Sequence, residues 1–155
     1  MNEDRASVFE VAGGDAAFFA LASALNERCL EDPELNHPFS HPGHPQHLEH
    51  LAAYFAEVFG GPTIYSDTLG GHPAMLSIHA SSGANDDLPT RFAHCFIVAM
   101  DDAGLPNDPQ LRQVMSDYIV WATSEVHSYS PRGSVVPTDH AFPHWSWDGL
   151  VTPPR

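Results

Sequence analysis

The stretch from Phe59 to His79 constrains the fold of this chain more than any other part of the sequence. It contains two glycine pairs, at 60–61 and 70–71, and a proline follows each pair closely. Glycine adopts backbone angles that a side chain forbids, and proline restricts the turn that contains it. A short apolar helical turn lies after the second pair and ends at His79. The stretch therefore predicts one imidazole held in a fixed position between stiff loops.

The rest of the chain is patterned for helices. Apolar residues recur at spacings of three and four, and no stretch alternates in the way that a half-buried strand does. The predicted helices are a short one at residues 6–11, a long one that follows an N-cap at Asp15 and ends before Pro33, one from Pro45 to Phe59, one from Asp86 to Gly104, and one from Asn107 to Pro131. The predicted fold is all-α.

Residues 1–131 are predicted to form one domain, followed by an irregular tail at residues 132–155. The tail contains Phe142, Trp145 and Trp147 together with four prolines. Aromatic side chains at this density are more often buried against a domain than left in water. We therefore expect the tail to dock on the domain, and the alternative is a tail that binds a partner.

The charge balance excludes several classes of function. The formal net charge is −14, and all six basic residues are arginine. A surface of this kind repels phosphate backbones and anionic lipids, so no nucleic acid and no membrane is expected as a partner. The N-terminus lacks the apolar core of a signal peptide, and the expected location is cytoplasmic.

The two cysteines, Cys29 and Cys95, do not have the spacing of a metal site or of a thioredoxin-like motif. They fall at core-facing positions of two different predicted helices, where a free thiol behaves as a small apolar group. A redox pair is the alternative interpretation.

Several motifs resemble those of group II truncated haemoglobins. The resemblance is based mainly on three motifs, which are Gly-Gly-Pro-x-x-Tyr at 60–65, Gly-His-Pro at 71–73 and, after them, His79. Gly13-Gly14, the run from Glu31 to Leu35 and the long C-terminal helix occur in the family's order, over about residues 8–131. This resemblance implies a compact 2-over-2 helical sandwich, haem b as the cofactor, and reversible binding of oxygen or another diatomic gas such as nitric oxide or carbon monoxide.

The resemblance also implies roles for individual residues. His79 matches the proximal ligand of the haem iron. On the distal side, Phe39 matches the aromatic residue against the haem face, His47 the distal histidine, and Leu51 the apolar residue beside the gas. Further candidates for haem contacts are Tyr54, Leu76 and Phe96. The family often has an arginine for a haem propionate just before the proximal histidine, but this chain has Ile78 there, and Arg91 is the nearest candidate for that cation.

Two positions depart from the family pattern. Asn26 stands where the family usually has a tyrosine, and Phe92 stands where group II members have a tryptophan. Phenylalanine has no hydrogen-bond donor. Because a hydrogen bond to a charged acceptor is worth about 1.5–3 kcal/mol, we expect this chain to hold oxygen less tenaciously than its relatives. Binding of the iron by His47 itself, in the absence of gas, remains open.

A rival interpretation uses a histidine cluster. Between residues 37 and 50, histidines recur every three or four residues. Positions three apart on a helix are rotated by about 60° relative to the same face, so only neighbouring histidines can share a metal. Glu49 is the one nearby carboxylate. The alternatives are therefore a non-haem helical metal protein, or a haem-free interaction module that uses the tail. The clustered histidines are His37, His41, His44, His47 and His50.

No arrangement of catalytic residues is apparent in the sequence. It contains no defensible nucleophile triad, phosphate-binding loop or carboxylate pair. Turnover of nitric oxide or peroxide would need electrons from an unknown reductase. The chain is accordingly predicted to be a gas-binding haem protein, with oxygen transport as the associated role and dioxygenase or peroxidase chemistry as a side activity.

Overall fold

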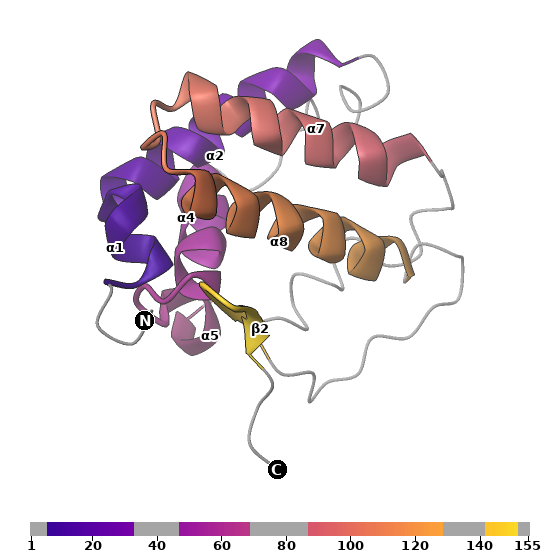
Figure 1. Ribbon diagram of the computed structural model, residues 1–155. Helices are drawn as coiled ribbons and strands as arrows, with labels where there is room; N and C mark the ends of the chain where they lie inside the picture. Colours follow the sequence, from indigo (N-terminus) through magenta and orange to yellow (C-terminus); the bar gives the residue numbers. More distant parts are fainter. Residues whose placement is uncertain (1–5, 33–46, 69–86, 129–141, 152–155) are drawn as a thin grey trace.

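Helices account for most of the residues that the computed structural model describes, which are 6–32, 47–68, 87–128 and 142–151. Within these ranges the all-α prediction is confirmed, apart from one short hairpin (Figure 1). The elements are α1 (Val8–Ala12), α2 (Gly14–Glu31), α4 (His47–Val58), α5 (Ile64–Thr68), α7 (Asp87–Asp102), α8 (Pro109–Ser128), β1 (His144–Ser146) and β2 (Gly149–Val151).

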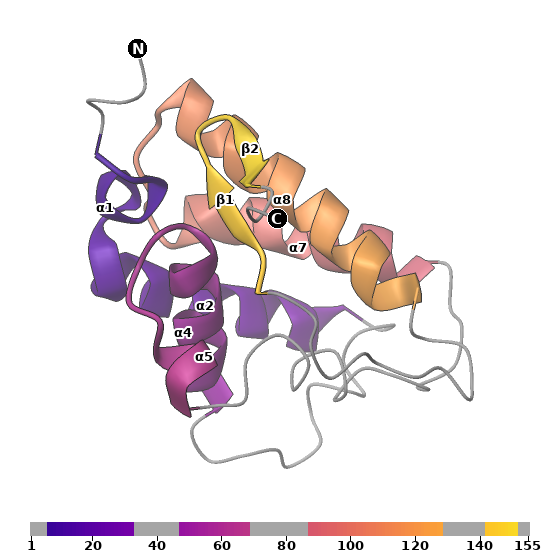
Figure 2. The same cartoon turned by 90° about the horizontal axis from the view of Figure 1, so that it is seen from below.

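The four long helices form two packed pairs. Helix α2 packs against α4 and also against α7, and α7 packs against α8. Figure 2 shows α7 and α8 running side by side on one side of the molecule, with α2 and α4 on the other. This is the 2-over-2 arrangement that the family resemblance implies.

Aromatic rings join these helices at the centre of the core. The Phe18 ring of α2 lies 6.0 Å from that of Phe59, between ring centroids, and Phe59 lies 5.1 Å from Tyr118 of α8. Phe96 of α7 completes the group at 6.2 Å from Tyr118. All four are at most 1% exposed. Burial of one such side chain stabilises a fold by about 1.5–3 kcal/mol, so this group anchors both helix pairs.

The start of α2 differs from the prediction. The N-cap is Gly13 rather than Asp15, and its backbone φ is 124°. A side chain is strained at this angle, and a Cβ here would lie 2.9 Å from the Cβ of Ala17. Asp15 instead lies in the first turn, where its charge faces the positive end of the helix dipole.

Helix α4 ends before the glycine pair at 60–61, as predicted. A Cβ on Gly61 would lie 2.7 Å from Cδ1 of Phe9, so only glycine lets these two segments approach. The Gly61 N–H donates to the carbonyl of Ala56 at 2.8 Å, and the Phe9 N–H donates to that of Phe59 at 3.0 Å. The glycine pair therefore both stops α4 and lets α1 pack against its end.

Helix α5 was not expected from the sequence. A buried carboxylate supports it: Glu57 is 1% exposed and lies on α4. Its Oε1 accepts from the Ser66 N–H at 2.9 Å, and its Oε2 accepts from the Ser66 hydroxyl. Tyr65 is 7% exposed and packs edge-on against Tyr54, 5.1 Å away between ring centroids, which gives it a structural role.

The connection between α7 and α8 is held by one arginine. Arg112 donates from Nε to the carbonyl of Pro106 at 3.0 Å and from Nη2 to that of Leu105 at 2.8 Å, and it pairs with Asp101. The predicted start of α8 is confirmed, because Asp108 accepts from the N–H groups of Gln110 and Leu111 at 2.9 and 3.1 Å.

The prediction that the tail has no regular structure was wrong for residues 144–151. Strands β1 and β2 pair antiparallel, with Trp145 opposite Leu150. Trp145 is 9% exposed, and its ring lies 5.7 Å from Tyr118 and 5.9 Å from Trp121. Each strand has three residues, which is too short for an alternating pattern to stand out.

Two further contacts fix the hairpin region on the helices. The Trp147 indole N–H donates to the carbonyl of Ala6 at 2.9 Å. The Phe142 ring lies 4.8 Å from that of Tyr54 on α4. Among the described helices, none combines the length and the apolar character needed to cross a bilayer.

Candidate functional site

The predicted site residues divide into two sets. His79, Phe39 and Leu76 lie outside the described residues. His47 is the first residue of α4, and its side chain is outside the described part as well. The remaining six are on three helices that pack together: Asn26 on α2, Leu51 and Tyr54 on α4, and Arg91, Phe92 and Phe96 on α7.

Three of the residues that are predicted to be distal have described side chains, and they come from these three helices: Asn26, Leu51 and Phe92. Helix α2 contacts both of the others, so the fold brings the three segments together. All three side chains are partly buried. Leu51 and Phe92 pack against the edge of the core rather than inside it. Each therefore offers partly exposed apolar surface at the edge of the core.

Two other candidates lie deeper. Tyr54 is 5% exposed and is surrounded by the rings of Phe55, Tyr65 and Phe142. Burial raises the pKa of its phenol well above the usual range, so the group stays protonated. Phe96 is fully buried. Both residues thus pack in the core. Their contacts with haem stay a prediction.

Arg91 has a partner that sequence reasoning missed. Its Nη1 donates to Oδ1 and Oδ2 of Asp32 at 3.0 and 3.2 Å. Asp32 is the C-cap residue of α2, so this ion pair ties the start of α7 to the end of α2. Because Phe92 directly follows Arg91, the pair also helps to position a residue that is predicted to be distal. The only signal in the sequence was a carboxylate at a helix end, and that alone does not identify its partner.

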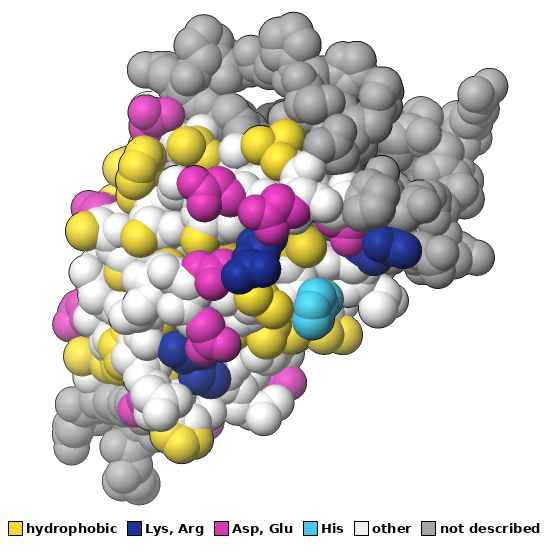
Figure 3. All heavy atoms as spheres, turned by 90° about the horizontal axis from the view of Figure 1, so that it is seen from above, with side chains coloured by type: hydrophobic (Ala, Val, Ile, Leu, Met, Phe, Trp, Pro, Cys, Tyr) yellow, Lys and Arg dark blue, Asp and Glu magenta, His cyan; other side chains and the backbone are white. Residues whose placement is uncertain are grey.

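A second ion pair joins the same two helices further along. Arg28 of α2 donates from Nε and Nη2 to the two carboxylate oxygens of Asp102 on α7, at 2.6 and 2.9 Å. These hydrogen bonds lower the pKa of Asp102. In Figure 3, arginine side chains lie directly against acidic ones on this face of the molecule. Two arginine–aspartate pairs therefore hold α2 against α7.

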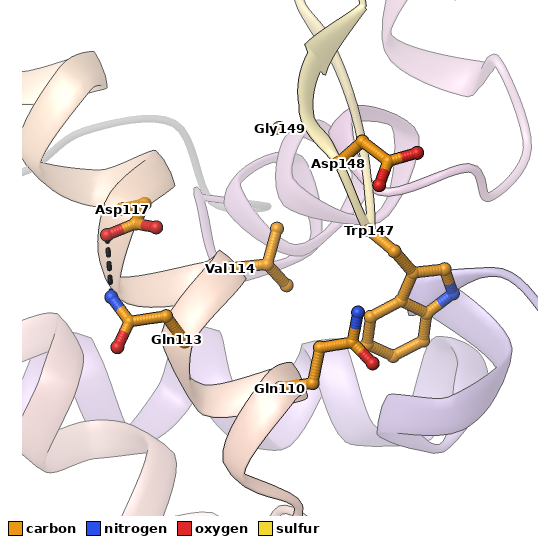
Figure 4. Close-up of a pocket in the computed structure, with 7 residues that line it drawn as sticks. All are labelled: Gln110, Gln113, Val114, Asp117, Trp147, Asp148 and Gly149. Atoms are coloured by element: carbon orange, nitrogen blue, oxygen red, sulfur yellow. Dashed lines mark hydrogen bonds between the residues drawn. The ribbon is translucent and has the colours of Figure 1, made fainter. Parts of the chain in front are cut away.

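A small hollow lies elsewhere, between α8 and the hairpin (Figure 4). Its volume is about 140 Å³. Asp117 and Asp148 lie on opposite sides of it, and Asp117 accepts from Nε2 of Gln113 at 2.8 Å. None of the predicted haem residues lines it. The lining residues are Gln110, Gln113, Val114, Asp117, Trp147, Asp148 and Gly149.

The rival metal interpretation depends mostly on residues outside the described ranges. His37, His41 and His44 are in that part of the chain, and of the cluster only His50 has a described side chain. Among the described side chains, no group of three or more histidine, cysteine, aspartate or glutamate residues is placed to hold a metal ion. The histidine cluster thus stays a prediction.

Comparison with known proteins identifies the fold. No curated protein sequence matches the chain. The haemoglobin of Chloroflexus aurantiacus is 28% identical, covers 79% of this chain and 98% of its own, and superposes with a TM-score of 0.67. The thermostable haemoglobin of Thermobifida fusca is 27% identical, over 78% of this chain and 96% of its own, with a TM-score of 0.65.

A third structure supports the same fold at lower identity. The group II 2-on-2 haemoglobin of Agrobacterium tumefaciens is 23% identical, covers 81% of this chain and 97% of its own, and has a TM-score of 0.67. The resemblance to group II truncated haemoglobins is confirmed at the level of the fold. The model of the bacterial-like globin family matches residues 7–124. The chain belongs to the bacterial-like globin family.

Proposed function

We propose that this protein binds haem b through His79 and reversibly binds a diatomic gas, oxygen in the first place. The observation that carries the proposal is the family match over residues 7–124, which includes His79 and all the predicted distal residues. The similar solved structures from Chloroflexus aurantiacus and Thermobifida fusca are haemoglobins. Globin membership implies a haem iron cofactor.

The described residues fit such a cofactor. A flat apolar ring with two propionates needs an apolar wall and a cation near its edge. Leu51 and Phe92 supply partly exposed apolar surface at the rim of the core. Arg91 is the proposed cation, and its ion pair with Asp32 holds the start of α7, where Phe92 follows it. When bound, haem supplies an iron with an open position for a small gas.

The protein's own side chains set how that gas is held. Leu51 and Phe92 exclude water from the distal side, and the Asn26 amide can donate one hydrogen bond. His47 is the other proposed donor. Phe92 offers none, so the site has fewer donors than the family pattern. Reaction with nitric oxide or peroxide would consume electrons from a separate reductase, and the proposed location is the cytoplasm.

An absorbance spectrum of the purified protein tests the proposal. A strong Soret band with haem near one per chain is expected for the wild type. In His79→Ala the band should be lost, because even loss of an outer-shell partner of a metal ligand costs roughly 10–100-fold in affinity. His50→Ala on α4 is the matched control and should retain haem. Full haem retention by His79→Ala would show that another residue is the iron ligand.

A further inference from the structure

The two cysteines are neighbours in the fold, although they are far apart in sequence. Cys29 on α2 is 0% exposed and Cys95 on α7 is 6% exposed. Burial, and then the adjacent Cys95 thiol, raises the pKa of Cys29. Each thiol thus lies within interaction range of the other, across the packed seam between α2 and α7.

The flanking ion pairs fix this seam from both sides. Cys29 lies between Arg28 and Asp32 on α2, and the partners of those residues bracket Cys95 on α7. Arg28 pairs with Asp102 near the end of α7, and Asp32 pairs with Arg91 near its start, so the two helices run antiparallel along this seam. The two buried thiols are close enough across this seam to interact, and a disulfide needs side chains that approach each other from closely packed backbones.

We propose that Cys29 and Cys95 form a reversible intramolecular disulfide that clips α2 to α7 beside the distal residues. Asn26 lies one turn before Cys29, and Phe92 lies one turn before Cys95, on the corresponding helix faces. The bond would lock the separation of the helices that carry these two residues. Its effect on gas binding rests on the proposed function, whereas formation of the bond does not.

Hydrogen peroxide is a sufficient oxidant. The Cys95 thiolate attacks one peroxide oxygen and the O–O bond breaks, so that one water leaves and a sulfenic acid remains. The Cys29 sulfur then displaces the sulfenic oxygen as a second water, and the S–S bond forms. Two thiols thereby lose two electrons and two protons while one peroxide becomes two waters.

Cys95 is the better first nucleophile of the two. Burial and then Asp32 raise the pKa of Cys95, but Cys29, Arg28 and Arg91 lower it. For Cys29, every contribution raises the pKa. Because the thiolate is the reactive form, oxidation should begin at Cys95 and be slow at neutral pH.

Mass spectrometry of the full-length protein after treatment with hydrogen peroxide tests the bond. The expected result is a monomer that has lost two hydrogens, with a peptide containing Cys29 linked to one containing Cys95, and full reversal by dithiothreitol. The oxidised monomer should also melt roughly 5–15 °C higher than the reduced one. Cys29→Ala and Cys95→Ala are the matched controls and should show neither change.

The bond is refuted if the treated wild type keeps two free thiols while its methionines are oxidised, if the thiols become sulfinic acids, or if disulfides link separate chains.

Stopped-flow oxygen dissociation then tests the effect of the disulfide on the proposed gas pocket. A rate that changes about twofold or more on oxidation, in the wild type alone, supports coupling to the distal residues. An unchanged rate in a protein shown to contain the bond overturns the coupling. A protein without haem would refute the proposed function and leave the mass measurement intact.

Discussion

At the scale of single residues, Phe92 and Asn26 make the proposed pocket different from the family pattern. Both are partly buried on packed helices, and Phe92 follows the Arg91–Asp32 ion pair. The proposed pocket therefore has an apolar side chain at a position where the family pattern has a donor. Substitutions at this position can separate hydrogen bonding from packing.

Restoring a donor at position 92 should slow oxygen release. Phe92→Trp adds an indole N–H beside a gas that accepts hydrogen bonds, and one such bond of about 1.5–3 kcal/mol corresponds to roughly tenfold or more in dissociation rate. Carbon monoxide is less polar when bound, so its release should change much less. Stopped-flow dissociation of both gases measures the contrast. Phe19→Trp, at a 43% exposed position of α2, is the control.

Steric crowding by the larger ring of Phe92→Trp would give a different pattern of dissociation rates. If the larger ring only fills space, both gases are released more slowly by the same factor. If neither rate changes, position 92 does not face the bound gas, and its assignment to the distal pocket is wrong.

Glu57 is a second residue whose role can be tested. Replacing it with alanine leaves the N–H and hydroxyl of Ser66 without their acceptor and removes a buried side chain from the junction of α4 and α5. We expect Glu57→Ala to lower the free energy of unfolding by about 2–4 kcal/mol. Urea denaturation measures this change. Glu49→Ala, at an exposed position of the same helix, should cost less than about 0.5 kcal/mol. Equal costs for the two variants would exclude a special role for Glu57.

At the scale of elements, the long helices were predictable and the short elements were not. Apolar spacing along α2, α4, α7 and α8 repeats over several turns, and Gly60 and Asp108 mark an end and a start by local chemistry alone. Helix α5 depends on Glu57, nine residues before Ser66, and hairpin formation depends on burial of Trp145 against α8. Such tertiary contacts leave no periodic signal in the sequence.

The candidate site shows the same division. The family motifs pointed to Asn26, Leu51 and Phe92, and the fold brings their helices together. Neither the partner of Arg91 nor the facing of Cys29 and Cys95 was predictable, because both depend on the register between two helices separated by over fifty residues of chain. Helix register is set by packing, which a single sequence does not reveal.

The hairpin should contribute to stability mainly through one ring. Trp145→Ala is expected to lower the free energy of unfolding by about 3–5 kcal/mol, because it empties a site between Tyr118 and Trp121. Trp145→Phe should cost less, since the buried indole N–H has no hydrogen-bond partner among the described residues. Thermal or urea denaturation measures both variants.

The control for this experiment lies on the partner strand. Leu150 is 44% exposed opposite Trp145, and Leu150→Ala should change stability by no more than about 0.5 kcal/mol. A Trp145→Ala protein as stable as the control would mean that the hairpin does not stabilise the helices and would favour a tail used for partner binding.

At the scale of the whole molecule, buried phenols and thiols predict sensitivity to alkali. Burial raises the pKa of Tyr54, Tyr65 and Tyr118 above 10.0, and that of Cys29 and Cys95 above 9.0. Above these values the unfolded chain loses protons that the native state keeps, so it binds fewer protons and stability falls with rising pH. Stability from these groups is fully present below about pH 9 and is lost above it, by up to about 1.4 kcal/mol per pH unit for each group.

Urea denaturation between about pH 8 and pH 11 measures the slope. Tyr118→Phe is the informative variant, because Tyr118 is 1% exposed and its phenol is removed with little change in ring packing. This variant should show a shallower fall in stability than the wild type above about pH 10. A wild-type stability that stays flat to pH 11 would mean that the phenols are not differentially protonated.

The placement of arginine has a consequence for proteolysis. The chain has no lysine, and α2, α7 and α8 each contain a single arginine, namely Arg28, Arg91 and Arg112. Each of these arginines is held by an aspartate. Trypsin cleaves after arginine or lysine, and a bond inside a helix is cut only when that helix opens. Arg5 and Arg132 lie outside these helices, so cuts there do not report on them. A fragment whose mass shows a cut after Arg28, Arg91 or Arg112 identifies which of the three helices unwound, so that trypsin acts as a label-free reporter of three separate local openings.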